Sequence, residues 1–436
     1  MKIQRLFLIF FLVLPAGALA DDEGSSLGVG GRLFSNIYGP TQEKWTSETR
    51  ALQQENGLLI HANPKLSEAN SFRVEGEFLN RRRTADRNNE HTTVEVREGY
   101  YQYYKTGLEF RAGRLITPWG VSDGFNPTDF LTGKRRARFS TDEENLRTGA
   151  DGLLLSYGFE EGASPWNITM VYNFGFVPST FLLPPDSIPS TTSVHDEETI
   201  RTQTKNSEMA LKMSYLKADQ DFSFILFDGW ARLPLLESDG FQNGVLVLTP
   251  RYDRIKALGL NYSVTLDESV LRFEAAYIHR STKLDKAITT NSYYDAVLGY
   301  ERPFFEKLRL QLQVLGRYFP IYVTKQEVLG RSTTEQDANE SIATANNYLQ
   351  GSQEKTRIGS TLRLSYGDQD STWTPEIFVL TYPSTNETLL RAKLMHRFNA
   401  HLQFDVGHDR YFGPRDTAFG LYERFSSVFA EGRLLF

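Results

Sequence analysis

The sequence predicts an all-β fold: a transmembrane antiparallel β-barrel of about eighteen strands, with sixteen also compatible. Apolar and polar residues alternate with a period of two along most of the chain, and the connections between these segments are mostly short and long in turn. Aromatic residues make up 13% of the chain, with 21 Tyr and 30 Phe, although its mean hydropathy is polar. A barrel places such rings on its outer face and at the two membrane interfaces.

The beginning of the chain, residues 1–20, has the features of a secretory signal peptide. Lys2 and Arg5 precede a short apolar run, and an A-x-A cleavage site ends at Ala20. The apolar run is shorter than the roughly 20 residues that a membrane-spanning helix needs. We therefore expect cleavage after Ala20 and a single barrel domain, residues 21–436, in the bacterial outer membrane.

Composition and motifs argue against several classes of function. The chain has 48 Lys and Arg against 54 Asp and Glu, and loss of the leader removes two cations, which leaves 46 against 54 and a net charge of −8. It contains no Cys, which excludes a disulfide scaffold, thiolate catalysis and Cys-ligated metal. No GxSxG, HExxH or phosphate-binding glycine loop is present, and the seven His are scattered. We expect no catalytic activity, cofactor, metal or nucleic-acid partner.

The alternation is clearest from Lys307 to Val314, where even positions are apolar and odd positions are charged or amide. A β-sandwich gives the same alternation, so periodicity alone does not decide between the two folds. No long window shows a helical period that competes. We expect strands near residues 27–38, 48–62, 70–82, 92–104, 106–116, 149–158, 165–175, 205–217, 220–231, 253–266, 269–279, 291–302, 305–317, 355–366, 372–382, 387–398, 400–410 and 424–436.

The lengths of the connections favour the membrane barrel. Outer-membrane barrels have short periplasmic turns and longer external loops, whereas a sandwich has no reason to alternate in this way. With the mature N-terminus in the periplasm, the long connections all fall outside, and only 383–386 is shorter than the pattern expects. The long connections are 117–148, 176–204, 232–252, 318–354 and, less long, 280–290 and 411–423.

The last strand ends in a terminal aromatic residue. Val428, Ala430, Leu434 and Phe436 share one face of it, although two apolar neighbours blur the alternation. A C-terminal Phe that closes such a strand resembles the signal by which bacterial outer-membrane proteins are recognised. We therefore expect the barrel-assembly machinery as a partner through Phe436, and membrane lipid and lipopolysaccharide as the barrel's surroundings.

The polar faces of the strands give a charge map of the lumen. Strands near 70–116 carry both signs, whereas the C-terminal third is rich in cations, with Asp405 and Glu431 as the inward acids and Glu376 in an ambiguous register. A cationic wall favours anions, but the same cations can also pair with carboxylates on neighbouring strands. The inward cations are Lys307, Arg309, Arg317, Arg357, Arg363, Arg391, Lys393, Arg397 and Arg433.

The long connection 117–148 is the most unusual part of the chain. Pro118 cannot donate to a sheet ladder, so strand pairing should stop there. The loop is long enough to fold inward and narrow the pore; alternatively, it lies on the external rim with Trp119 as an interface anchor. Its second half carries four cations, Lys134, Arg135, Arg136 and Arg138.

The segment from Arg97 through GLEFRAGRLITPWGVSDGFNPTDFLT resembles a family of Gram-negative outer-membrane barrels with a GRQxxxWGxxDxxNPxD-type signature, related to porin-like and alginate-export-type barrels. Gly99 stands where Ala is usual and Leu115 where Gln is usual, which removes one polar group from the loop or lumen. The resemblance implies a passive barrel and leaves the solute open. The matching residues are Gly113, Arg114, Trp119, Gly120, Asp123, Asn126, Pro127 and Asp129.

These observations predict a porin-like channel for passive diffusion of small hydrophilic solutes with some preference for anions. Two alternatives stay open: an export conduit for an acidic polysaccharide or another envelope polymer, and a non-transport barrel for envelope assembly or adhesion. The oligomeric state is also open. The pore-lining candidates are Lys134, Arg135, Arg136, Arg138, Arg309, Arg363, Arg391 and Lys393.

Overall fold

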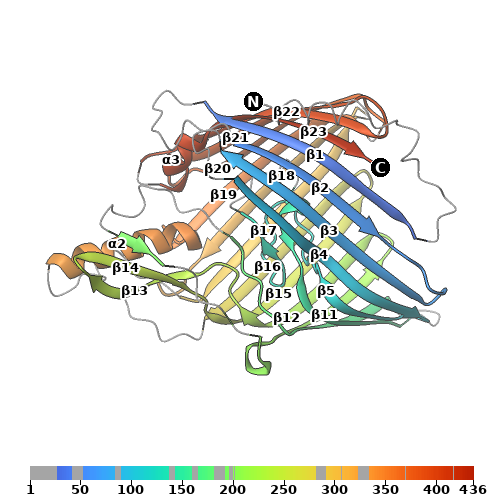
Figure 1. Ribbon diagram of the computed structural model, residues 1–436, viewed down its shortest axis with the longest axis horizontal. Helices are drawn as coiled ribbons and strands as arrows, with labels where there is room; N and C mark the ends of the chain where they lie inside the picture. The colour runs from blue at the N-terminus through green and yellow to red at the C-terminus, as the bar shows by residue number, and fades with distance from the viewer. Residues whose placement is uncertain are drawn as a thin grey trace.

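A computed structural model describes residues 27–41, 53–83, 90–136, 143–159, 165–180, 192–195, 200, 202–280, 291–305, 307–322, 333–368, 370–415 and 417–436. The predicted signal peptide lies outside these residues. The described chain forms a closed antiparallel barrel of 18 strands (Figure 1). In ring order they are β1 (Val29–Pro40), β2 (Gln53–Ala62), β3 (Asn70–Arg83), β4 (Glu90–Lys105), β5 (Leu108–Leu115), β8 (Ala150–Gly158), β9 (Trp166–Asn173), β11 (Glu208–Lys217), β12 (Gln220–Trp230), β15 (Arg254–Leu266), β16 (Ser269–Arg280), β17 (Tyr293–Phe304), β18 (Leu308–Tyr318), β19 (Thr356–Tyr366), β20 (Trp373–Tyr382), β21 (Glu387–Arg397), β22 (Leu402–Phe412) and β23 (Ser427–Leu435).

The first and last strands close the ring. β1 pairs with both β2 and β23, and the N–H and C=O groups of Gly31 and Phe436 bond each other at 2.7 and 3.0 Å. All of the barrel strands overlap the segments expected from the alternation, with ends that differ by a few residues. The strand number of eighteen is confirmed, and sixteen is excluded.

Side-chain alternation separates an apolar outer face from the lumen. On β12, Phe224 and Leu226 are exposed on the outside, whereas Ile225 and Phe227 are buried inside. A belt of exposed apolar side chains around a barrel is what contact with hydrocarbon requires. Within the described residues, no helix combines the length and apolar character needed to cross a membrane.

The two ends of the barrel differ. One end has short turns such as Thr106-Gly107, and we call it the short-turn end; the other, the long-loop end, carries every additional element (Figure 1). These elements are β6 (Gly133–Lys134), η1 (Glu143–Leu146), β7 (Arg147–Thr148), β10 (Thr192–Val194), η3 (Thr204–Asn206), β13 (Leu235–Gln242), β14 (Val245–Arg251), α2 (Thr333–Gln350), α3 (Ala418–Tyr422) and η5 (Glu423–Phe425).

The helix α2 corrects the expectation that no long window is helical. It packs on the three-stranded sheet β10–β14–β13, and the two project together from the long-loop end (Figure 1). Ile342, Ala345 and Leu349 bury one stripe of the helix against Leu236 and Leu248. This i, i+3, i+7 spacing was the helical signal, but the otherwise polar sequence of the loop masked it.

Candidate functional site

The long connection 117–148 folds into the lumen. Glu274 of β16 faces inward, since its neighbour Phe273 is exposed outside, and its side chain is fully buried. Its carboxylate accepts hydrogen bonds from the backbone N–H groups of Val121, Ser122 and Thr128 at 3.0, 3.1 and 2.8 Å, and from the Thr128 hydroxyl at 2.8 Å. The alternative of a loop on the external rim is therefore wrong.

The loop also reaches the opposite wall. The Asp123 carboxylate accepts a hydrogen bond of 2.6 Å from the guanidinium of Arg363 on β19. β19 is the ninth strand from β5 in either direction around the ring of 18, so it lies diametrically opposite the strand that the loop leaves. The described part of 117–148, which we call the crossing loop, thus spans the lumen.

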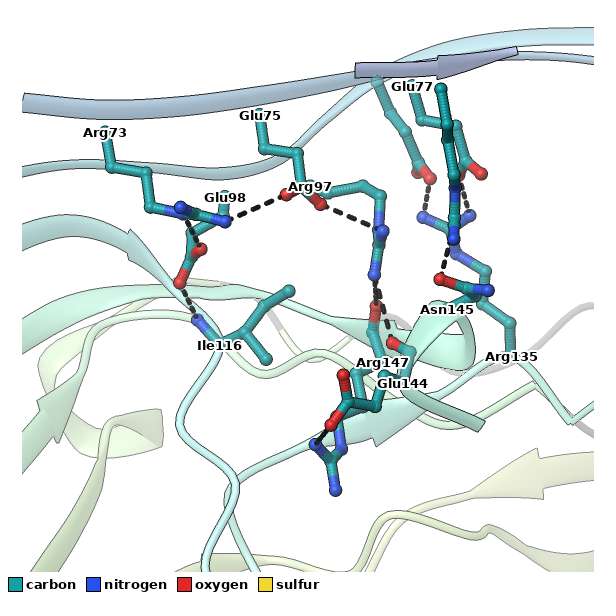
Figure 2. Close-up of polar contacts among 12 residues, drawn as sticks. Arg73, Glu75, Glu77, Arg97, Glu98, Ile116, Arg135, Glu144, Asn145 and Arg147 are labelled. Atoms are coloured by element: carbon teal, nitrogen blue, oxygen red, sulfur yellow. Dashed lines mark hydrogen bonds and ion pairs between the residues drawn. The ribbon is translucent and has the colours of Figure 1, made fainter. Parts of the chain in front are cut away.

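On the side nearest its origin, the crossing loop is held by a ladder of charges on β3 and β4 (Figure 2). Arg135 pairs with both Glu77 and Glu95. Arg97 donates to the backbone oxygens of Glu144 and Arg147, each at 3.2 Å.

The ladder continues toward the start of the loop. Arg97 also pairs with Glu75 at 2.9 Å, and Arg73 pairs with Glu98 at 2.7 Å (Figure 2). Glu98 accepts a hydrogen bond of 3.3 Å from the N–H of Ile116, so the same ladder holds the residue just before the loop. The cations of this wall are engaged in holding the loop and the strands together.

An apolar cluster fills the lumen beneath the loop. Trp119, Phe130 and Leu131 are buried against inward side chains of β8 to β16, and the rings of Phe130 and Phe227 stack with centroids 5.5 Å apart. Leu115 belongs to this cluster. Leu115, which stands where the signature predicted from the sequence has Gln, therefore contributes apolar packing.

Two of the signature glycines are explained by backbone geometry. Gly113 has φ +139°, and a Cβ there would lie 2.2 Å from the backbone oxygen of Gly99 on the paired strand. Gly120 has φ +124°, and a Cβ there would meet Asn126 at 2.9 Å and the Glu274 carboxylate at 3.0 Å. Only glycine lets the chain leave β5 and pass close to its anchor without strain.

The other signature residues have different surroundings. Arg114 lies on the outer face of the barrel, where it makes two hydrogen bonds of 2.8 and 2.9 Å to Asp151. Pro127 lies in a turn in which the backbone oxygen of Asn126 accepts from the N–H of Asp129 at 3.2 Å. Burial raises the pKa of the Asp129 carboxyl, and nearby cations act in the opposite direction.

A second loop enters the lumen in the same way. Phe419 of α3 donates its backbone N–H to the buried carboxylate of Glu387 at 2.9 Å, and Arg357 pairs with that carboxylate at 3.0 Å. Likewise, buried Glu208 accepts the N–H of Trp230 and an N–H of Arg232. The sequence analysis missed Glu208, Glu274 and Glu387, because nothing distinguishes them from other acids on the polar face of a strand.

Most predicted pore-lining cations on the wall are paired. Arg391 makes two hydrogen bonds to Asp409 at 2.6 and 2.7 Å, and Lys393 lies 3.6 Å from Glu376, which therefore faces inward. Arg309 is the most exposed, with 59% of its side chain accessible. The basic excess is smaller than expected because Glu376, whose register was ambiguous, faces inward and four other inward acids were overlooked. They are Asp295, Glu301, Glu387 and Asp409.

The basic half of the crossing loop is partly built into the structure. Lys134 forms the short β6–β7 pair and donates its backbone N–H to Ser179 at 2.9 Å. Arg135 is tied to β3 and β4, and Arg136 is exposed. Arg138 lies outside the described residues. Among those that are described, no cluster of three or more His, Cys, Asp or Glu could hold a metal ion.

Solved structures with the same fold are outer-membrane porins. OccAB3 of Acinetobacter baumannii superposes with a TM-score of 0.53 at 10% identity, over 94% of this chain and 98% of that chain. OccK9 (OpdG) of Pseudomonas aeruginosa gives 0.52 at 8% identity, over 94% and 97%. At these identities the likeness establishes the barrel architecture. No protein-family model and no curated relative matches the chain, so the resemblance through the loop signature stays a prediction.

Proposed function

We propose that the protein is a porin-type channel of the outer membrane, through which small hydrophilic solutes diffuse passively. The observation that carries the proposal is the crossing loop, which leaves β5 and is anchored at Glu274 and at Arg363 on the far wall. A fixed loop inside a wide barrel narrows the passage without closing the pore. It also favours small solutes over the polymer of the export alternative.

The anion preference that we propose depends on few side chains. Paired Arg and Lys contribute a weak net field, because each is offset by a carboxylate within 4 Å. Arg309 is different: it is largely exposed, and its partner Glu301 is shared with Arg272 at 2.7 Å. A modest preference for anions, centred on Arg309, follows from this arrangement.

Single-channel recording of purified protein in planar bilayers tests the proposal. The wild type is expected to conduct steadily. Glu274→Gln removes the charge that holds three backbone N–H groups, so the loop should loosen and the current should become noisier and larger. Glu109→Gln is the matched control, since Glu109 lies on the wall and pairs with Arg111.

The outcomes separate two claims. An absence of conductance in the wild type would contradict the channel itself. Steady conductance that is identical in the wild type and Glu274→Gln would leave the channel standing and overturn the role of the crossing loop.

A further inference from the structure

A cluster of cations lies on the outer face of the barrel, at the long-loop end of β12, β15 and β16. Lys256 is exposed and points outward, like its neighbour Leu258. Its cross-strand partners in the register are Asp228 and His279, and His279 is also exposed. Residues at such paired positions have Cβ atoms about 5 Å apart.

Two other basic residues lie beside Lys256. Arg254 precedes Lys256 by two residues on the same face, and its guanidinium donates to the backbone oxygens of Lys205 and Ser207, each at 3.2 Å. Lys205 itself is exposed. We call Lys205, Arg254 and Lys256, together with the adjacent imidazole of His279, the outer cation patch.

The patch has a surplus of positive charge. Asp228 is the carboxylate that faces it in the register, and Asp228 is engaged by Arg254 at 2.6 Å. Lys256 makes no ion pair with any residue in the described part of the chain. Exposed cations that outnumber the acids beside them require an anionic partner or solvent.

Aromatic and apolar side chains lie beside the patch and below it on the outer face. Arg254 lies over the Trp230 ring at 5.8 Å, and the rings of Tyr277 and Tyr294 have centroids 4.7 Å apart. Next along the strands come exposed apolar residues, among them Leu258 and Leu298, at 46% and 55%. Aromatic belts mark the boundary between water and hydrocarbon, so the cations lie at the level of lipid headgroups.

We propose that the outer cation patch binds the phosphate groups of a phosphorylated glycolipid in the external leaflet, with its acyl chains along Leu258 and Leu298. Cations above an apolar face fit a molecule that is anionic at one end and hydrocarbon at the other. A free phosphate would use only the cations. The proposal rests on the proposed function only for the outer-membrane setting, with the long-loop end outside.

Binding of lipopolysaccharide to purified protein in detergent, followed by native mass spectrometry, tests the proposal. Lys205→Gln combined with Lys256→Gln should weaken binding by roughly 25-fold, because each cation near a charged lipid contributes about fivefold. Lys217→Gln, an exposed lysine at the short-turn end, is the matched control and should bind as the wild type does. Dephosphorylated lipopolysaccharide should bind the wild type as weakly as the double variant binds the intact lipid.

The alternative outcomes overturn the proposal in distinct ways. Equal binding by the wild type and the double variant would contradict the patch, and full competition by inorganic phosphate would indicate a site for free anions. Mass spectra that show another protein bound at the patch in place of lipid would indicate that the patch is a protein interface. Single-channel conductance of the double variant, expected to equal that of the wild type, keeps a failure here distinct from a failure of the channel.

Discussion

Buried carboxylates on the lumen wall position the loops of this barrel. Glu208, Glu274 and Glu387 are each fully buried. Glu274 and Glu387 accept backbone N–H groups from loops that turn inward, and Glu208 accepts the N–H of Trp230 at the end of β12 and an N–H of the Arg232 side chain in the loop that follows. A buried carboxylate left without donors carries a large desolvation cost, and hydrogen bonds to charged groups contribute about 1.5–3 kcal/mol each. The loop and its anchor therefore stabilise each other.

Asp129 makes the docking of the crossing loop depend on pH. Burial raises the pKa of its carboxyl, although Lys134 and Arg147 act in the opposite direction. Since the docked loop has the higher pKa, protonation favours docking: docking strengthens as pH falls through the raised pKa, and the gain is complete below the ordinary value of 3.8. We expect Asp129→Asn to dock more firmly than the wild type at neutral pH.

Single-channel noise recorded between pH 7 and pH 4 checks this expectation. The variant should be quieter than the wild type at pH 7, and the two should converge as pH falls. The difference between the curves isolates the contribution of Asp129, because every other carboxylate is the same in both proteins. Asp368→Asn, at an exposed turn, is the control. Curves that stay parallel over the whole range would contradict the role of Asp129.

At the scale of single residues, the sequence predicted which side chains face inward better than it predicted their partners. Arg363 and Arg391 were placed on the polar face of their strands from the alternation alone. Their partners, Asp123 and Asp409, lie 240 and 18 residues away in the chain. Such pairs depend on strand register and loop path, which alternation does not specify.

At the scale of elements, α2 and the sheet β10–β14–β13 form a lobe whose parts are joined by Asn346 and which is linked to the barrel through Gln350. The buried side-chain amide of Asn346 makes the two hydrogen bonds to Leu236 that a neighbouring strand would make. Its oxygen accepts from the backbone N–H of Leu236 at 2.7 Å, and its nitrogen donates to the backbone oxygen of Leu236 at 3.0 Å. Gln350 links the end of α2 to Arg280 of β16 and to the oxygen of Pro234.

We expect Asn346→Ala to loosen the lobe and leave the barrel intact. Two buried backbone groups would lose their partners, at a cost of about 2–4 kcal/mol. Hydrogen exchange followed by mass spectrometry should show faster exchange in 235–251 and 333–350 and unchanged exchange in β16 and β17. Thr344→Ala, at a half-buried position of the same helix, should exchange as the wild type does. Faster exchange throughout the barrel would mean that the lobe and barrel unfold together.

The barrel strands could be predicted from the sequence, whereas the helices and strands inside the loops could not. A barrel strand lies between hydrocarbon and lumen, so its two faces alternate strictly, and this pattern is visible in the sequence. The hairpin β13–β14 and the helix α2 bury one face against each other instead. The apolar residues of each segment indicate a buried face only once the other segment is known to pack against it. The two segments are about ninety residues apart in the chain.

At the scale of the whole molecule, the lumen has unlike walls. From β8 to β16 it is lined by the apolar cluster beneath Trp119, Phe130 and Leu131. From β17 around to β5 it carries ion pairs such as those of Arg317, Arg357 and Arg391. A smaller apolar cluster that includes Val297, Leu315 and Leu380 lies among them. A solute that crosses the barrel therefore meets charges on one side, and its selectivity depends on which of these charges are accessible.

Arg309→Gln tests whether one accessible cation sets the selectivity of the whole channel. Glu301 keeps Arg272 as a partner in the variant, so the fold should be unchanged. A unit charge about 10 Å from a permeating ion in water attracts an anion and repels a cation by about 0.4 kcal/mol each, so the ratio of anion to cation permeability should fall roughly fourfold. Arg302→Gln is the matched control, because Arg302 precedes the same turn but faces outward. Reversal potentials in a salt gradient measure the ratio. Equal shifts in both variants, or none in Arg309→Gln, would assign the selectivity of the channel to other groups.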